Sequence, residues 1–136
     1  MIILTDNHAA RLQRMRPALV TPALGEELEA GAQAIAESAI ASILDGGISG
    51  PGHVASAPGE APNADTHDLD QSIHIGELVE TPGEVKSSVI ADSDHAWIER
   101  GGSKMEPRPY MEPAVERERR DVIDALHKRF KSIVGL

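Results

Sequence analysis

The sequence predicts an α+β fold, in which an Ala-rich N-terminal helix and an amphipathic C-terminal helix pack on a small, mainly antiparallel β-sheet. Apolar residues recur at helical spacing between about residues 21 and 44, and again between about 113 and 134. Residues 72–75 and 85–90 between them have the short runs that are typical of strands. The resulting order of helices, strands and a final helix favours helices layered on one small sheet.

The N-terminal part predicts two helices. Residues 6–16 (DNHAARLQRMR) can form a short one that Pro17 ends. A longer helix should begin at Thr21-Pro22, where Thr can cap and Pro can take the first helical position, and should end before Gly46-Gly47. The apolar stripe of this helix contains Leu24, Leu28, Ala32, Ile35, Ala36, Ala39, Ile40 and Ile43. Its alanines would let a sheet or a partner approach closely.

Residues 46–65 (GGISGPGHVASAPGEAPNAD) predict a long exposed loop, because Gly, Pro, Ala and Ser dominate and neither the helix nor the strand period is present. This loop does not have the pattern of a phosphate-binding loop. Neither GxxxxGK[ST] nor GxGxxG occurs, and Glu60 and Asp65 would repel phosphate.

The second half predicts a hairpin and a helix. Residues 72–75 and 85–90 should pair as antiparallel strands through a turn at 81–84 (TPGE), and residues 96–98 offer a third strand. The final helix should begin near Glu112-Pro113. Its apolar stripe would contain Val115, Val122, Ile123, Leu126, Phe130, Ile133 and Val134.

Residues 97–114 (WIERGGSKMEPRPYMEPA) have the most constrained local conformation. Each proline fixes φ and lacks an N–H, so residues 101–113 predict an extended, proline-rich arm that carries Arg108 and Tyr110. Two uses fit such an arm. An aromatic residue and an arginine are common anchors of protein interfaces, and Trp97 and Tyr110 could equally close the core beneath the final helix.

Composition limits the class of protein. A chain of 136 residues predicts a single domain, spanning residues 1–136, and one Trp, one Tyr and one Phe leave a core of small aliphatic side chains with modest stability as a monomer. There is no cysteine, which excludes disulfides, thiol nucleophiles and thiolate metal sites. We expect no membrane span and no signal peptide, because no apolar run is long enough and the N-terminus lacks the signal pattern.

The net charge of −9 is unevenly distributed. No Lys or Arg lies between Arg16 and Lys86, whereas that interval holds twelve acidic residues. Nucleic-acid binding depends on Lys and Arg that neutralise phosphates, so this half should repel DNA and RNA. The basic residues that follow Lys86 are mixed with acids, as on an ordinary solvated surface.

No catalytic or metal-binding pattern is evident. The six histidines contain no HxxxH pair, and no serine lies in a GxSxG or SxxK motif. Two carboxylates at a hydrolytic spacing would occur by chance among 22 acidic residues, so they carry little weight. We therefore expect no enzymatic activity, no catalytic residues, no cofactor and no metal.

Two ordered motifs resemble a family of neck proteins of tailed bacteriophages. The first is residues 56–62 (SAPGEAP) followed by Asp65-Thr66, Leu69 and Ser72-Ile73. The second is residues 95–101 (HAWIERG), then 103–105 (SKM) and 107–114 (PRPYMEPA). The similarity covers about residues 6–133. Two positions depart from the family pattern: His67 stands where the family usually has Gly, and His95 where it usually has Tyr. The turn before Leu69 could therefore differ in shape, since Gly permits backbone angles that other residues resist.

The resemblance implies a structural virion protein of the siphophage type, in the role of head-tail connector or tail-completion protein. Such a protein forms a homo-oligomeric ring, expected to be a hexamer, that joins the head connector to the tail tube during tail assembly. It is made in the host cytoplasm and ends in the virion neck. Its partners would be adjacent head-closure, tail-terminator or tail-tube proteins, with DNA only as passing cargo and no membrane. A tail-terminator or head-closure ring, a soluble binding module and a small hydrolase are the alternatives.

The resemblance and the shape of the arm together suggest candidate interface residues. They are Thr66, Leu69, Trp97, Glu99, Gly101, Lys104, Met105, Pro107, Arg108, Pro109, Tyr110 and Pro113. An acidic segment without lysine also suits a channel wall along which DNA slides without sticking. A ring would give each subunit two neighbours to cover its thin core.

Overall fold

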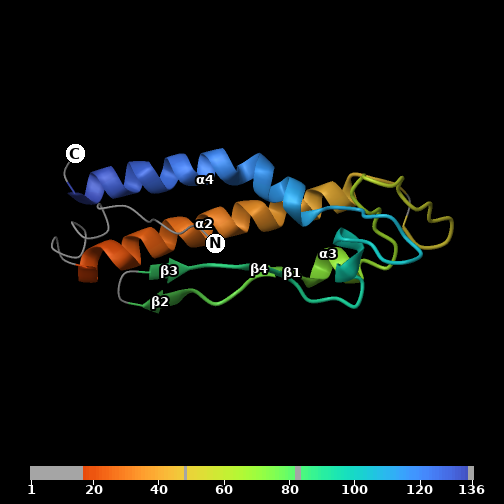
Figure 1. The fold of residues 1–136 in the computed structure, drawn as a ribbon, viewed down its shortest axis with the longest axis horizontal. Coiled ribbons are helices and arrows are strands. Elements are labelled where there is room, and N and C mark those ends of the chain that lie inside the picture. The colour runs from red at the N-terminus through yellow and green to blue at the C-terminus, as the bar shows by residue number, and fades with distance from the viewer. Residues whose placement is uncertain (1–16, 48, 82–83, 135–136) are drawn as a thin grey trace.

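The computed structural model describes residues 17–47, 49–81 and 84–134. Two long helices, α2 (Pro17–Leu44) and α4 (Met111–Val134), lie alongside each other. Strands β1 (Ile73–Ile75), β2 (Val79–Thr81), β3 (Glu84–Lys86) and β4 (Val89–Ala91) lie on the other side of α2 (Figure 1). The α+β class and the helices on a small antiparallel β region are as the sequence predicts.

Helix α2 begins earlier than expected. The helix starts at Pro17 and contains Pro22, so Thr21 is not its cap. Pro17 is tolerated because the first residue of a helix has no use for an N–H, while Pro22 removes one helical hydrogen bond near the start. The end at Leu44 is as predicted, and Gly47 follows with a φ of 80°. The short helix expected at 6–16 lies outside the described residues.

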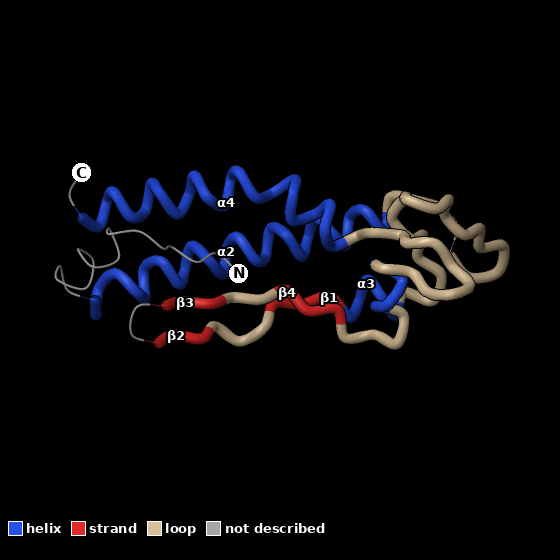
Figure 2. Tube along the Cα trace, in the orientation of Figure 1, coloured by secondary structure: helices blue, strands red, loops and turns tan. Residues whose placement is uncertain are grey.

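The four strands form one interrupted antiparallel hairpin rather than a continuous sheet. β1 pairs with β4 from Ile73↔Ala91 to Ile75↔Val89, and β2 pairs with β3 from Val79↔Lys86 to Thr81↔Glu84. The predicted strand at 85–90 is thus divided between β3 and β4, and β2 had no sequence prediction. Figure 2 shows both ribbons running along α2.

The predicted third strand at 96–98 is wrong. These residues belong to a 3-10 helix, η1 (Ala96–Glu99). Ala96 N–H donates to the Ser93 carbonyl at 3.0 Å and Ile98 N–H to the His95 carbonyl at 3.1 Å, so local bonds satisfy the backbone and no strand partner is needed. A second short helix, α3 (Asp68–Ser72), precedes β1.

The core is thin and lies at the C-terminal half of α2. Among the described residues, ten apolar residues are buried and five of them are alanines. Tyr110 and Ile43 are the largest side chains that are fully buried. On α4, Ala114 is fully buried whereas Val115 is 36% exposed, so the first turn of α4 presents its smaller residue to α2 and the predicted place of Val115 in the stripe is wrong.

The helices approach closely because small residues line their contact. Gly31 on α2 faces Val122 on α4, and a Cβ at Gly31 would lie 2.8 Å from Val122 Cγ1. The Ala-rich stripe therefore contacts another helix on one side and the hairpin on the other. No helix within 17–47, 49–81 and 84–134 is long and apolar enough to cross a membrane.

Candidate functional site

The arm and the segment between α2 and α3 meet at the end of the molecule that lies away from β2 and β3 (Figure 1). Within the described part of residues 45–67 there is no helix or strand. Three residues of this segment, Ser56, Pro62 and Ala64, are buried, so the segment is not exposed along its whole length as the sequence predicted. Ala64 N–H donates to the Ile43 carbonyl at 3.3 Å and attaches the segment to the end of α2.

Three hydrogen bonds hold the arm against this segment and against η1. Arg108 Nε donates to the Ser56 carbonyl at 3.0 Å, across 52 residues of sequence. Gly59 N–H donates to the Pro107 carbonyl at 3.0 Å, and Arg108 N–H donates to the Ile98 carbonyl at 2.9 Å. The segment at residues 56–59 and the arm at residues 107–108 therefore pack against each other.

Glu99 closes the N-terminus of α4. Its Oε2 accepts the N–H of Tyr110 at 2.7 Å and of Met111 at 2.8 Å, and its Oε1 accepts the N–H of Glu112 at 3.0 Å. The first four N–H groups of a helix lack helical partners, and the fourth residue here, Pro113, has no N–H. The Glu99 carboxylate therefore accepts all three N–H groups that need a partner at this helix end. Its negative charge also lies at the positive end of the helix dipole.

Tyr110 belongs to the core rather than to an exposed arm. Its side chain is 2% exposed, and its hydroxyl donates to the Ala96 carbonyl at 3.2 Å. Burial raises the pKa of the Tyr110 hydroxyl above its ordinary value, and the nearby Glu99 carboxylate raises it further. Of the two uses open to the aromatic residues, Tyr110 closes the core beneath α4.

Trp97 has the opposite environment. The side chain is 50% exposed although it lies only thirteen residues before Tyr110. Beyond it, Gly101 has a φ of 70°, and a Cβ there would lie 2.6 Å from the Met105 carbonyl, so a glycine is required. Gly102 and Met105 then pair as a β-bridge that closes a tight turn with Lys104 on it.

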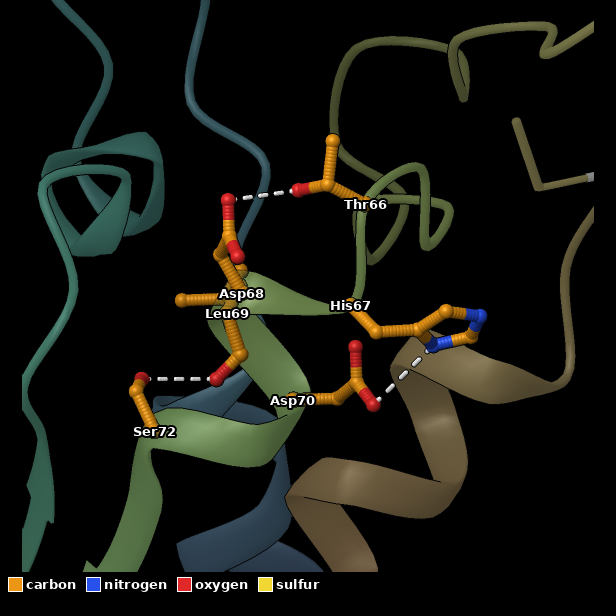
Figure 3. A network of polar contacts seen from close by, with 6 residues as sticks. All are labelled: Thr66, His67, Asp68, Leu69, Asp70 and Ser72. Atoms are coloured by element: carbon orange, nitrogen blue, oxygen red, sulfur yellow. Dashed lines mark hydrogen bonds and ion pairs between the residues drawn. The ribbon is translucent and has the colours of Figure 1, made fainter. Parts of the chain in front are cut away.

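The turn before Leu69 is held by polar contacts that involve Thr66, His67 and Asp70 (Figure 3). His67 has a φ of 67° and is the one residue other than glycine with a positive φ in the described part of the chain. Its Nδ1 lies 3.2 Å from Asp70 Oδ2, and Asp70 is buried. Thr66 Oγ1 donates to Asp68 Oδ2 at 2.7 Å, while Leu69 enters the core.

The twelve candidate residues divide by location. Leu69 and Tyr110 are buried, and Glu99, Arg108 and the Pro107 carbonyl make internal hydrogen bonds. Met105, Pro109 and Pro113 are half-buried. Thr66, Trp97 and Lys104 are exposed, and Gly101 shapes the turn between Trp97 and Lys104.

Sequence reasoning missed Ser56 as the partner of Arg108 and Ala96 as the partner of Tyr110. Both partners are carbonyl groups, which every residue carries, so no residue type could have marked them. Within residues 17–47, 49–81 and 84–134, no three or more His, Asp or Glu side chains gather where they could hold a metal ion. Comparisons with models of protein families, with curated proteins and with solved structures found no match to this chain.

Proposed function

We propose that the protein is a structural subunit of a bacteriophage neck, which forms a homo-oligomeric ring at the tail-completion level between the head connector and the tail tube. The observation that carries this proposal is the backbone of His67. The resemblance places a glycine at this position, and His67 adopts the left-handed φ of 67° that glycine favours. A chance likeness of short motifs gives no reason for a histidine to accept that angle.

The contact between the two motifs supports the same proposal. Residues 56–62 and 107–114 are distant in sequence, yet Arg108 contacts Ser56 and Pro107 contacts Gly59. A signature whose two halves form one folded unit is expected when its residues were selected together.

The charge and the thin core agree with a ring around a DNA channel. The described part of the segment between residues 17 and 85 carries acidic residues and no Lys or Arg, so a surface built from it would let DNA pass without binding it. Half of the buried apolar residues in the described part of the chain are alanines, and such a core gains from neighbours that cover further apolar surface.

The test is the place of the subunit in phage particles. Disrupting the gene in the phage that encodes it should leave filled heads and tails that do not join, and electron microscopy of labelled particles should place the subunit as a ring at the neck. A label on the head-closure or terminator layer would move the protein to that neighbouring ring. Joined particles that lack the protein would overturn the proposal.

A further inference from the structure

The two ends of the molecule carry opposite features. At one end, the turn after η1 forms an open hollow lined by residues 100–107. Trp97 lies beside this turn, with its ring carbon Cζ3 3.8 Å from the position of a Cβ on Gly102. We call Trp97, Arg100, Lys104 and Met105 the basic tip.

The cations of the basic tip are unpaired. In the described part of the chain, neither the Arg100 guanidinium nor the Lys104 ammonium makes a hydrogen bond or an ion pair, and both residues are exposed. Glu106 also lines the hollow but forms no ion pair with either of them. Trp97 is half exposed, and a tryptophan beside free cations is the composition of an interface anchor.

At the other end, an acidic patch of Glu29 and Glu80 lies where the Glu80 side chain reaches Gly25 of α2. Glu80 Oε1 lies 3.0 Å from the position of a Cβ on Gly25, and Glu29 follows Gly25 by one helical turn on the same face. Lys86 does not neutralise this patch. It pairs with Glu84 at 3.2 Å, and its register partner Val79 is on the opposite face of the ribbon from Glu80.

We infer that the basic tip of one molecule docks on the acidic patch of a second copy of this chain, in a head-to-tail contact. Among the described residues, neither the tip cations nor Glu29 and Glu80 form an ion pair, so these opposite charges gain from meeting in another molecule, and the exposed Trp97 supplies the apolar area of the contact. Strands β2 and β3 and the arm lie at opposite ends of the long axis (Figure 1), so the basic tip of one molecule does not reach the acidic patch of the same molecule.

The head-to-tail contact specifies the interface between subunits of the proposed ring, and it rests on the proposed function for the closure of that ring. A contact between two different surfaces repeats from copy to copy, and the rotation at each step decides whether the assembly closes into a ring. The inference thus names the two surfaces through which ring subunits meet.

Charge reversal tests the contact on the purified full chain by sedimentation velocity. The tip variant Arg100→Glu with Lys104→Glu, and the patch variant Glu29→Lys with Glu80→Lys, should each self-associate at least about tenfold more weakly than the wild type. An equimolar mixture of the two variants should associate again, because each now offers the surface that the other needs. The matched control Arg119→Glu with Lys131→Glu, on exposed positions of α4, should behave as the wild type.

A second measurement uses the chain's one tryptophan. Emission from Trp97 should shift to shorter wavelength as the wild-type concentration rises, and the patch variant should not show that shift. Circular dichroism should show that both variants remain folded.

A mixture that stays dissociated, or a control that weakens association equally, would overturn the contact. A Trp97 shift caused by duplex DNA and not by protein concentration would also overturn it and assign the tip to nucleic acid. Restored association together with absence from phage particles would retain the contact and reject the neck role instead.

Discussion

The helix pair and the arm hold together in different ways. Helix α2 packs on α4 and on the hairpin through small buried residues such as Gly31, Ala36 and Ala39, where no single group dominates. The arm is held by a few polar groups, each of which contacts atoms far away in the sequence, as Glu99 and Arg108 do. A substitution at any one residue of the helix face should therefore lower the free energy of unfolding only partly. In the arm, the large losses should be confined to a few residues.

The largest loss should follow Tyr110→Ala. This change empties the space of one of the two largest fully buried side chains, and it should lower the free energy of unfolding by about 4 kcal/mol. Urea denaturation measures the loss. Val79→Ala, on an exposed position of β2, is the control and should change stability little. A Tyr110→Ala protein as stable as the wild type would show that the arm is not fixed to the core.

Tyr110→Phe separates the hydroxyl from the ring. The pKa of the folded Tyr110 is raised by burial and by Glu99, so the folded state holds the proton more tightly than the unfolded state. The stability from this difference is complete below the ordinary tyrosine pKa and is lost as pH rises through the folded pKa. Unfolding free energy measured between pH 8 and 11 should fall at the alkaline end for the wild type and fall less for Tyr110→Phe.

Glu99→Ala should have the next largest effect, a loss of about 2 kcal/mol. This change leaves three N–H groups at the start of α4 without their acceptor. Glu99→Gln keeps one oxygen and should lose roughly half as much. Glu106→Ala, which removes an exposed carboxylate from the same arm, should be neutral. Equal losses for Glu99→Ala and Glu106→Ala in urea denaturation would contradict the capping role.

Gly31→Ala tests the helix face and should cost about 1.5 kcal/mol. The added Cβ would lie 2.8 Å from Val122 Cγ1, and this crowding outweighs the better helix propensity of alanine. Combining Gly31→Ala with Val122→Ala removes the Val122 methyl groups that the new Cβ would crowd. Double-mutant analysis of urea unfolding should give a combined loss smaller than the sum of the single losses. Additive losses would mean that the two residues do not meet.

The difference between the periodic helices and the arm, whose contacts are distant in sequence, also explains which features the sequence could predict. The period of α2 and its glycine stop were readable up to Leu44, and the alternation of residues 72–75 predicted β1, because each depends on neighbours a few positions away. The 3-10 helix at residues 96–99 was missed because a run of three apolar residues is too short for its period to distinguish a strand from a turn of helix. The start of α2 at Pro17 was missed because the helix tolerates an internal proline at Pro22. Glu99 was a candidate for contact between chains, and nothing in the sequence indicated that its partners lie eleven to thirteen residues ahead.

The smallest effect concerns His67, whose left-handed backbone angle is the feature under test. A left-handed residue other than glycine costs about 1 kcal/mol, and here the bond to Asp70 partly offsets that cost. His67→Ala and His67→Gly both lose the imidazole, but only glycine also removes the strain. The free energy of unfolding measured by urea denaturation should therefore be about 1 kcal/mol higher for His67→Gly than for His67→Ala. Because the two variants differ only in Cβ, their difference measures the backbone angle, and equal stabilities would mean that the turn before Leu69 does not require the glycine conformation.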